Sequence, residues 1–424
     1  MYFFNLPIRT FQHDSRLIKA GDLFFALTGA RSDGHHYLND VAEKGAIAAV
    51  IREDFFPRPE HLFCVPVPNV QAKLQAMASE AFTKASLQAI GVTGSVGKTT
   101  TKEFLAILLQ GSRAVAKTPA SCNSQVGLPL SILNEIEGCN AFVMEMGMSR
   151  PGELAKLVQM APPDIGMITQ IALAHAASFP DGLKGIAAAK AEIFSHARTK
   201  TGVIHAQVAG FISDPFITYG SNDEYRFADY RIEKIGEEYQ IYEGSTLSPR
   251  FLLPFKARHL VENALGALVV ARQMGLSWEE VLPRCMELKT CSNRFSWEER
   301  QGVRFLNDSY NANPASMKAA LKALQEVSRS GRLIAVLGSM RELGSFEATA
   351  HQQVGEMAAD VVDALLCIGH ECGPLVDCFV KRGKPVEWLD SLENVGKRLA
   401  EWALPGDLVL LKGSNSHQLW KLLQ

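Results

Sequence analysis

Residues 87–104, LQAIGVTGSVGKTTTKEF, place the strongest constraint on the fold of this chain. An apolar run, a glycine-rich turn and a run with helical periodicity follow one another, which predicts a buried strand, a loop and a helix. Such a loop offers backbone N–H groups and the positive end of a helix to an anion. The spacing differs from the usual phosphate loop, because Val92 stands where the first glycine is expected and Gly94 lies inside the loop. We therefore expect an α/β protein that binds a nucleotide phosphate.

The side chains at the end of this loop are those that a magnesium nucleotide requires. Lys98 can neutralise the outer phosphates, and Thr99 or Thr100 can offer a hydroxyl to Mg²⁺. The same residues also fit a plain glycine turn followed by a helix-capping threonine. The succession of strand, loop and helix favours the nucleotide interpretation.

Three side chains later in the sequence are candidates for a metal centre. Glu145 ends the apolar run AFVMEMG, and ligands of such folds bind at the carboxyl ends of the strands. His175 follows the run IGMITQI, where it could bind a metal or orient water. Lys190 lies in an alanine-rich helical stretch. The alternative for Glu145 is an ordinary glutamate at a strand end. The alternatives for His175 and Lys190 are a structural histidine and a surface lysine.

The alternation of strands and helices divides the chain into three α/β units, residues 1–84, 85–290 and 291–424. The first contains the strand candidates DLFFAL and AIAAVI and ends in the amphipathic helix QAKLQAMASEAFTKAS. The second predicts a mostly parallel sheet covered on both faces, with an antiparallel extension where residues 224–255 alternate with period two. The third holds five strand candidates, VRFLND, RLIAVLGS, ALLCIG, PVEWL and DLVLLKGS, which predict a Rossmann-like, doubly wound sheet.

The composition narrows the class of protein. The formal net charge of −2 gives no basic excess for nonspecific nucleic-acid binding. No apolar run approaches the roughly 18 residues of a membrane span, and the N-terminal residues lack the features of a signal peptide. The 8 cysteines among 424 residues are too sparse for a disulfide framework. We expect a cytoplasmic protein with reduced thiols, no nucleic-acid partner and no membrane insertion.

Six motifs occur in the order found in the Mur ligases, the ATP-dependent enzymes that build the peptide stem of peptidoglycan. They are GVTGSVGKTTTKE, TPASCNSQVGLPLSIL, MEMGMSRPGEL, AKAEIF, HLVENALGA and NDSYNANPASMKAAL. The N-terminal stretch DSRLIKAGDLFFALTGARSDGHHY extends the resemblance over most of the chain. YNANPASMKAAL and LGSMRELG are most similar to the branch that joins D-alanyl-D-alanine to a UDP-N-acetylmuramoyl tripeptide. The resemblance implies that the three units bind UDP, ATP and the amine substrate in turn.

The resemblance also implies roles for individual residues around ATP and Mg²⁺. ATP would be held by Gly94, Ser95, Gly97, Lys98, Thr99, Thr100, Asn263, Arg294 and Asp308. The metal would lie among Thr99, Glu145, His175 and Lys190, and the catalytic residues would be Lys98, His175 and Lys190. Lys190 matches a lysine that the family carries as a carbamate, which turns a cation that Mg²⁺ repels into an anion.

Two further groups of residues are implied to bind the other substrates. The UDP-sugar would be held by Ser15, Arg16, Ser32, Asp33, Gly34 and His35, for which a surface turn is the alternative. The amine substrate would be held by Asn123, Tyr310, Asn311, Asn313 and Ser339. Asn313 precedes Pro314 and also fits a helix N-cap, which could be its whole role.

The chain departs from the family pattern at two positions. Ser339 replaces an acid, and Asn415 replaces an arginine. Arginine can bind a carboxylate through two parallel hydrogen bonds and asparagine cannot, so the recognition of the dipeptide carboxylate or the local packing differs. One hypothesis is that Lys412 compensates for this loss.

The resemblance implies a peptide-bond ligase that works through an acyl phosphate. The γ-phosphoryl group of ATP would pass to the tripeptide carboxylate, and the amine of D-alanyl-D-alanine would then displace phosphate. Closure of the domains would exclude water. The alternatives are a sibling ligase that adds the third stem residue, a folylpolyglutamate synthase, and a P-loop kinase or nucleotide switch. The chain is expected to act as a monomer.

Overall fold

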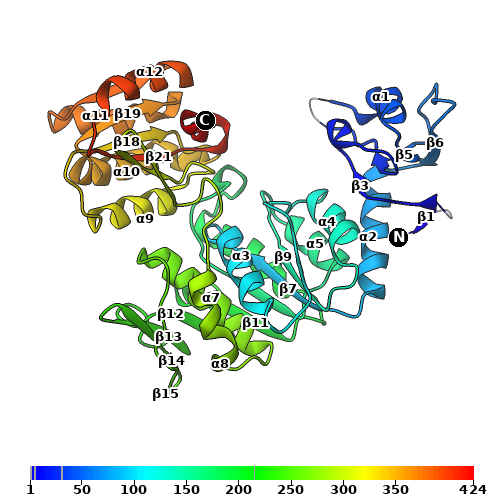
Figure 1. Cartoon of the computed structure of the whole chain (residues 1–424), viewed down its shortest axis with the longest axis horizontal. Coiled ribbons are helices and arrows are strands. Elements are labelled where there is room, and N and C mark those ends of the chain that lie inside the picture. Colours follow the sequence, from blue (N-terminus) through cyan, green and yellow to red (C-terminus); the bar gives the residue numbers. More distant parts are fainter. Residues whose placement is uncertain (1, 4–5, 30–31, 214) are drawn as a thin grey trace.

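Three α/β lobes make up the computed structural model, which describes residues 2–3, 6–29, 32–213 and 215–424. The central lobe, cyan to green in Figure 1, separates the blue N-terminal lobe from the yellow-to-red C-terminal lobe. Each lobe is built on its own sheet, of four, nine and six strands. The α/β architecture and the three mostly parallel sheets confirm the fold class expected from the sequence. Among the described helices, none combines the length and the apolar character that crossing a bilayer requires.

The N-terminal lobe contains a parallel sheet with the strand order β3-β4-β5-β6. Its strands are β3 (Phe11–Gln12), β4 (Leu23–Phe25), β5 (Ala48–Arg52) and β6 (Phe63–Val67), its helices are α1 (Leu38–Glu43) and α2 (Val70–Lys84), and β1 (Tyr2–Phe3) pairs with β2 (Leu6–Pro7). Asn134 of the central lobe joins the two lobes, because its side-chain amide exchanges two hydrogen bonds of 2.9 Å with the backbone of Phe11.

The central lobe is a nine-stranded sheet with the order β15-β14-β13-β12-β11-β10-β7-β9-β8. Its strands are β7 (Gln88–Thr93), β8 (Val115–Lys117), β9 (Ala141–Glu145), β10 (Ile165–Ile168), β11 (Thr201–His205), β12 (Ile217–Ser221), β13 (Tyr230–Ile235), β14 (Glu238–Glu243) and β15 (Thr246–Leu247). Its helices are α3 (Lys98–Leu109), α4 (Gly127–Glu135), α5 (Glu153–Met160), α6 (Leu183–Ala191), α7 (Arg258–Gln273) and α8 (Trp278–Val281). The strands are parallel from β8 through to β13, and β14 and β15 add the expected antiparallel extension.

Alternate side chains of the central strands enter two different cores. Ile90 and Val92 of β7 pack with α3 and α7 on one face, whereas Ala89 packs with α4, α5 and α6 on the other. Because neighbouring side chains of a strand point to opposite faces, a strand that is covered on both sides must be apolar throughout. This explains the continuous apolar runs that predicted β7, β9 and β10.

The C-terminal lobe has a six-stranded sheet with the order β16-β17-β21-β18-β19-β20. Its strands are β16 (Ser296–Arg300), β17 (Val303–Asn307), β18 (Leu333–Gly338), β19 (Ala364–Ile368), β20 (Val386–Leu389) and β21 (Leu408–Lys412), and its helices are α9 (Pro314–Gln325), α10 (Glu347–Val361), α11 (Gly373–Lys381) and α12 (Leu392–Trp402). The five predicted strands are present and parallel to one another. The sixth, β16, was not expected because SWEER is mostly polar. It pairs antiparallel with β17 through Gln301 and Gly302, whose positive φ angles suit a two-residue hairpin turn.

Helix α7 lies unusually close to the sheet at Gly266. A Cβ atom there would lie 2.5 Å from Met167 Cε and 2.7 Å from Cζ of the buried Tyr219 ring. Alanine at this position gains helix propensity but must displace the ring. Gly396 in α12 differs, since a Cβ atom there would meet only Leu422 at an ordinary 3.4 Å.

We therefore expect the same substitution to have opposite effects at these two helical glycines. Gly266→Ala should lower the midpoint of thermal unfolding, because overpacking costs about 1–3 kcal/mol. Gly396→Ala should raise it or leave it unchanged, because alanine is favoured over glycine in a helix by up to about 1 kcal/mol. Differential scanning calorimetry of both variants checks this, and a stabilising Gly266→Ala would contradict the packing described here.

Candidate active site

The loop between β7 and α3 contains two glycines that neighbouring segments make necessary. Gly94 and Gly97 have φ angles of +148° and +89°, in the region that favours glycine. A Cβ atom at Gly94 would overlap the Thr169 hydroxyl, and one at Gly97 would overlap the side-chain amide of Asn263. The positions of the two glycines in this loop are therefore determined by Thr169 and Asn263, which pack against it. Lys98 begins the helix, and its Nζ donates to the carbonyl of Gly94 at 2.8 Å.

Glu145 lies at the end of β9 and faces the first turn of α3. Its carboxylate accepts hydrogen bonds of 2.7 Å from Thr99 Oγ1 and from Asn123 Nδ2, and Glu145 is only 1% exposed. The backbone N–H of Glu145 donates to Thr118 Oγ1 at 2.9 Å, which fixes the strand end. A threonine hydroxyl and a carboxylate are thus held side by side below the loop, and both are oxygen ligands of the kind that Mg²⁺ prefers.

Lys190 is 3% exposed, so the surface lysine considered from the sequence is wrong. Burial, and then the charge of Lys98, hold the pKa of Lys190 well below its ordinary value. No ion pair or hydrogen bond within the described residues engages its amine. The charged form of this side chain is therefore disfavoured in this environment.

His175 connects the central and C-terminal lobes. It has a φ of +55°, and its Nδ1 contacts the carboxylate of Glu342. The backbone N–H of Ala177 donates to the Glu342 carbonyl at 3.0 Å in the same contact. Burial holds the pKa of His175 below its ordinary value, against the opposing effect of Glu342.

The part of the chain that the structure describes contains no cluster of three or more His, Cys, Asp or Glu side chains able to bind a metal. A magnesium site in this protein would thus combine Thr99 and Glu145 with other oxygen ligands.

The C-terminal lobe contributes a charged wall opposite the loop. Asp308 follows β17 and forms a 2.5 Å ion pair with Lys412 at the end of β21, where Lys412 is 1% exposed. Arg294 stacks on the Tyr310 ring, 3.9 Å from its centre. Asn415, in place of the family's arginine, donates to the Tyr310 carbonyl at 3.1 Å. Asp308, Tyr310, Lys412 and Asn415 lie at or after the ends of the parallel strands β17 and β21, and Arg294 precedes the antiparallel strand β16.

A cavity of about 530 Å³ separates this wall from the loop and collects most of the residues singled out from the sequence. It is lined by Ser95, Gly97, Lys98, Thr99, Thr100, Asn123, Glu145, His175, Asn263, Arg294, Asp308, Tyr310, Asn311 and Asn313. Gly94, Lys190 and Ser339 do not line it. Ser339 is buried, and its hydroxyl lies 2.9 Å from His417 Nε2.

Asn313 has the structural role that the sequence suggested. Its side chain accepts from the Ser316 N–H at 2.9 Å, and its own N–H donates to Ser316 Oγ at 3.1 Å, which closes a capping box at the start of α9. Its amide also reaches the Ser95 carbonyl at 3.5 Å. Asn313 therefore caps a helix and contacts the loop.

Two further side chains line this cavity: His259, which the sequence did not single out, and Lys412, which the sequence suggested only as a substitute for the missing arginine. Burial lowers the pKa of His259 to about 4, so its ring is neutral at pH 7. His259 stands four residues before Asn263, and residues four apart share a helix face, so the pattern HLVEN held the signal. The contact of Lys412 with Asp308 could not be found in this way, because it joins residues 104 positions apart.

The N-terminal candidates lie apart from this cavity. Asp33 accepts from the His35 N–H at 3.0 Å, and the buried His35 ring accepts from the Arg52 N–H at 2.9 Å. These contacts build a turn, in which a Cβ atom on Gly34 would lie 2.9 Å from a backbone nitrogen. Ser15 is buried, Ser32 is exposed, and the exposed Arg16 pairs with Asp14 at 2.6 Å.

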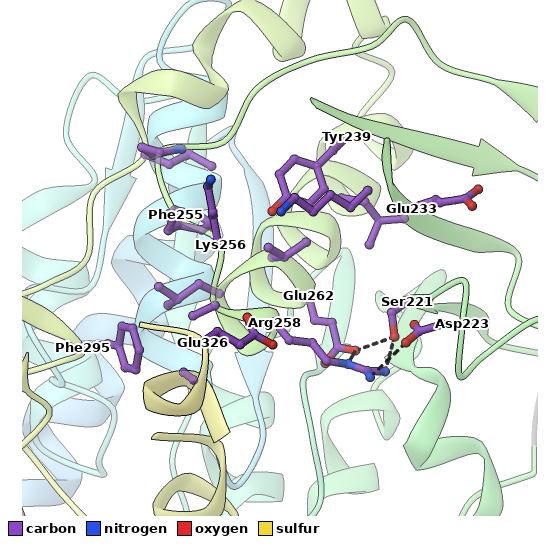
Figure 2. Close-up of a pocket in the computed structure, with 18 of the residues that line it drawn as sticks. Ser221, Asp223, Glu233, Tyr239, Phe255, Lys256, Arg258, Glu262, Phe295 and Glu326 are labelled. Atoms are coloured by element: carbon purple, nitrogen blue, oxygen red, sulfur yellow. Dashed lines mark hydrogen bonds and ion pairs between the residues drawn. The ribbon is translucent and has the colours of Figure 1, made fainter. Parts of the chain in front are cut away.

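A second cavity, of about 1480 Å³, lies beside the first turn of α7 and is lined by none of the residues that the sequence singled out. Figure 2 shows Tyr239, Phe255 and Phe295 around it. At its edge Arg258 meets Glu262, Ser221 and Asp223.

Three family models match successive parts of the chain. They are the Mur ligase family, catalytic domain over residues 7–81, the Mur ligase middle domain over residues 92–271 and the Mur ligase, glutamate ligase domain over residues 293–415.

Relatives and solved structures are similar over almost the whole chain. A UDP-N-acetylmuramoyl-tripeptide–D-alanyl-D-alanine ligase of Bacillus subtilis is 30% identical, across 97% of this chain and 91% of the relative. One from Synechocystis is 32% identical, across 95% and 88%. The crystal structure of a MurF ligase from Thermotoga maritima in complex with ADP is 28% identical, covers 99% of this chain and 97% of that one, and superposes with a TM-score of 0.80.

The loop geometry leads to a prediction about nucleotide binding. Gly97→Ala should weaken ADP binding by roughly tenfold or more, because the added methyl group must displace Asn263 or the loop. Gly138→Ala is the matched control, since Gly138 also has a positive φ, of +75°, but has nothing within 4 Å of its added Cβ. Calorimetric titration with ADP should show an unchanged Kd for the control. Equal losses in both variants would attribute the effect to backbone strain alone.

Proposed function

The chain belongs to the Mur ligase family, and from that premise we propose how its residues share one reaction. It is an ATP-dependent ligase of peptidoglycan synthesis that adds D-alanyl-D-alanine to a UDP-N-acetylmuramoyl tripeptide. The observation that carries the proposal is the cavity between the central and C-terminal lobes, which collects cations, carboxylates and amides around the phosphate loop. We assign UDP to residues 1–84, ATP to residues 85–290 and the amine substrate to residues 291–424.

The loop and the opposite wall are proposed to bind ATP from two sides. The backbone of Gly94–Gly97 and the side chain of Lys98 would hold the phosphates, with Ser95, Thr99 and Thr100 at the helix start. Asn263 would contact adenine, while Arg294 and Asp308 would reach the phosphates and the ribose. A free carboxylate is a poor electrophile, so transfer of the γ-phosphoryl group to the tripeptide activates it for attack by the dipeptide amine. The α-amino pKa of about 8 leaves part of that amine neutral near pH 7.5, so no strong base is required.

Thr99, Glu145, His175 and Lys190 are proposed to surround Mg²⁺. The 2.7 Å contact between the Thr99 hydroxyl and the Glu145 carboxylate fits such a site. The amine of Lys190 is buried and its pKa lies well below the ordinary value, which suits it to react with CO₂ in a step that forms an N–C bond, releases a proton and gives a carbamate anion. Bound Mg²⁺ would neutralise charge on the phosphoryl group.

The two remaining substrates are assigned to the outer lobes. Ser15, Arg16 and the turn of residues 32–35 would bind the UDP-sugar, with the exposed Arg16 on its diphosphate. Asn123, Tyr310, Asn311 and Asn313 would receive the dipeptide. Ser339, which is buried against His417, does not line the cavity and is not assigned to the dipeptide. We further propose that the protein acts as a monomer in the cytoplasm.

The proposed chemistry is tested by phosphate release and isotope transfer. Phosphate should appear with ATP, Mg²⁺ and UDP-N-acetylmuramoyl tripeptide only when D-alanyl-D-alanine is added, which separates this ligase from a kinase, a nucleotide switch and a sibling ligase. With an ¹⁸O-labelled tripeptide carboxylate, the released phosphate should carry one ¹⁸O atom. Unlabelled phosphate would refute an acyl phosphate.

Lys412 provides a second prediction, because its ammonium group already pairs with Asp308 at 2.5 Å and donates to the Asn311 carbonyl at 3.2 Å. We propose that it positions Asp308 for the nucleotide and does not replace the arginine missing at Asn415. Lys412→Ala should raise the KM for ATP more than the KM for D-alanyl-D-alanine in steady-state assays. Lys384→Ala, in the same lobe with its amine on the Val362 carbonyl, should change neither. A rise mainly in the dipeptide KM would instead support binding of the dipeptide carboxylate by Lys412.

A further inference from the structure

We propose that Glu262 is a positioning residue for the nucleotide, because its buried carboxylate joins helix α7 to the segment behind the phosphate loop. The proposal rests on the proposed function of this loop as the ATP site. Glu262 touches no substrate position itself. It acts through Gln170 on one side and through its neighbour Asn263 on the other.

The carboxylate of Glu262 is 6% exposed and contacts four side chains from different parts of the chain. Oε1 accepts from Ser221 Oγ at 3.0 Å and from Arg258 Nε at 3.2 Å. Oε2 accepts from Gln170 Nε2 at 3.4 Å and lies 3.4 Å from His205 Nε2. The carboxylate of Glu262 therefore lies where helix α7, the ends of β11 and β12 and the segment after β10 meet.

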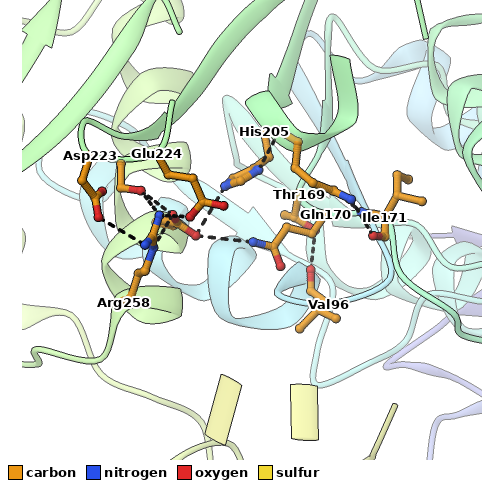
Figure 3. A network of polar contacts seen from close by, with 11 residues as sticks. Val96, Thr169, Gln170, Ile171, His205, Asp223, Glu224 and Arg258 are labelled. Carbon is orange, nitrogen blue, oxygen red and sulfur yellow. Dashed lines mark hydrogen bonds and ion pairs between the residues drawn. The ribbon is translucent and has the colours of Figure 1, made fainter. Parts of the chain in front are cut away.

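The state of each partner follows from its other contacts. His205 Nδ1 accepts from the Gln207 N–H at 3.2 Å, so a neutral His205 carries its proton on Nε2, toward Glu262. Burial raises the pKa of Glu262, but His205 and Arg258 lower it by more, and the pKa lies below its ordinary value. Arg258 in turn contacts Asp223 and Glu224, as Figure 3 shows. Glu262 is thus a buried carboxylate that is ionised at neutral pH.

Gln170 transmits this contact to the back of the phosphate loop. Its carbonyl accepts from the Ser95 N–H at 2.7 Å, and the preceding Thr169 donates its hydroxyl to the Val96 carbonyl at 2.5 Å. The Gln207 side chain holds the next residue, Ile171, by hydrogen bonds of 3.1 and 3.0 Å (Figure 3). Residues 169–171 are therefore held in place, and their hydrogen bonds to Ser95 and Val96 fix the position of the loop.

Helix α7 reaches the same loop from the other side. Asn263 follows Glu262 directly, and its amide occupies the space that a Cβ atom on Gly97 would need. The loop thus lies between Gln170 and Asn263, and Glu262 fixes the position of both. A buried ion pair is weak evidence for stability, since apolar replacements are often no less stable. A role in fixing the geometry of the loop gives a reason for a charge at this position.

The first experiment compares Glu262→Gln with Glu243→Gln. Glu243 is a matched control, because it pairs with Arg272 at the far end of α7 at 3.2 Å and accepts from Trp278 Nε1 at 3.1 Å. Titration of the free enzyme with ADP should show Kd raised about tenfold by Glu262→Gln, the size of effect expected when a charge-assisted contact is lost. The KM for ATP should rise in parallel, while the KM values for the UDP-tripeptide and the dipeptide stay within about twofold. Glu243→Gln should lower the unfolding temperature without changing the ADP Kd.

The second experiment tests the route through Gln170. Gln170→Leu alone should also weaken ADP binding, and the double variant with Glu262→Gln should be no weaker than the poorer single variant, because the two residues act through one contact. Gln170→Leu also tests the proposal if Glu262→Gln fails to fold. The proposal is overturned if Glu262→Gln leaves the ADP Kd unchanged, raises all three KM values equally, or adds fully to Gln170→Leu. Since ADP titration needs no ligase activity, failure of the dipeptide transfer would refute the function and not this relay.

Discussion

The conformation of the phosphate loop depends on neighbouring segments that pack against it from two sides. Much of the central lobe holds these two segments in place. Gly94 and Gly97 adopt conformations that other residues rarely reach, and Thr169 and Asn263 fill the space that their side chains would need. The Thr169 side is built by strand β10, and the Asn263 side by helix α7. Helix α7 can approach only because Gly266 lets it lie against Tyr219. The loop is thereby held in one shape, in which the Ser95 N–H donates to the Gln170 carbonyl and helix α3 begins at Lys98.

The sequence predicted the features that follow from the periodicity of apolar residues and from the positions of strand ends. Apolar runs that enter two cores predicted β7, β9 and β10, and an acid at the end of one run placed Glu145 beside Thr99. Parallel strands bring their carboxyl ends to one edge, so order along the chain becomes proximity in space. Contacts between side chains far apart in the sequence leave no such pattern. The pairs Asp308–Lys412, His175–Glu342 and Gln170–Glu262 therefore required the structure.

The predictions for single residues also depended on whether the signal in the sequence was local or came from distant contacts. Asn313 was correctly seen as a helix cap, because a capping box is local to four residues. The position of Lys190 in its helix is compatible with a surface lysine and with a buried one. Only the packing of the folded chain shows that Lys190 is buried. The polar strand β16 was missed because its pairing with β17 depends on a hairpin turn at Gln301 and Gly302. Local sequence patterns therefore predicted local structure, whereas burial and long-range pairing were visible only in the folded structure.

Charge explains why the site is divided between two lobes. Burial lowers the pKa of Lys190, and the nearby charge of Lys98 lowers it further. Across the cavity, Lys412 is already neutralised by Asp308. The central lobe thus places Lys98 near the carboxylate of Glu145, while the C-terminal lobe contributes the Asp308–Lys412 pair together with Arg294. The phosphates of a bound nucleotide would attract both Lys98 and Arg294, whose charges otherwise repel one another across the cavity. The contact between His175 and Glu342 shows that the two lobes already meet beside the loop.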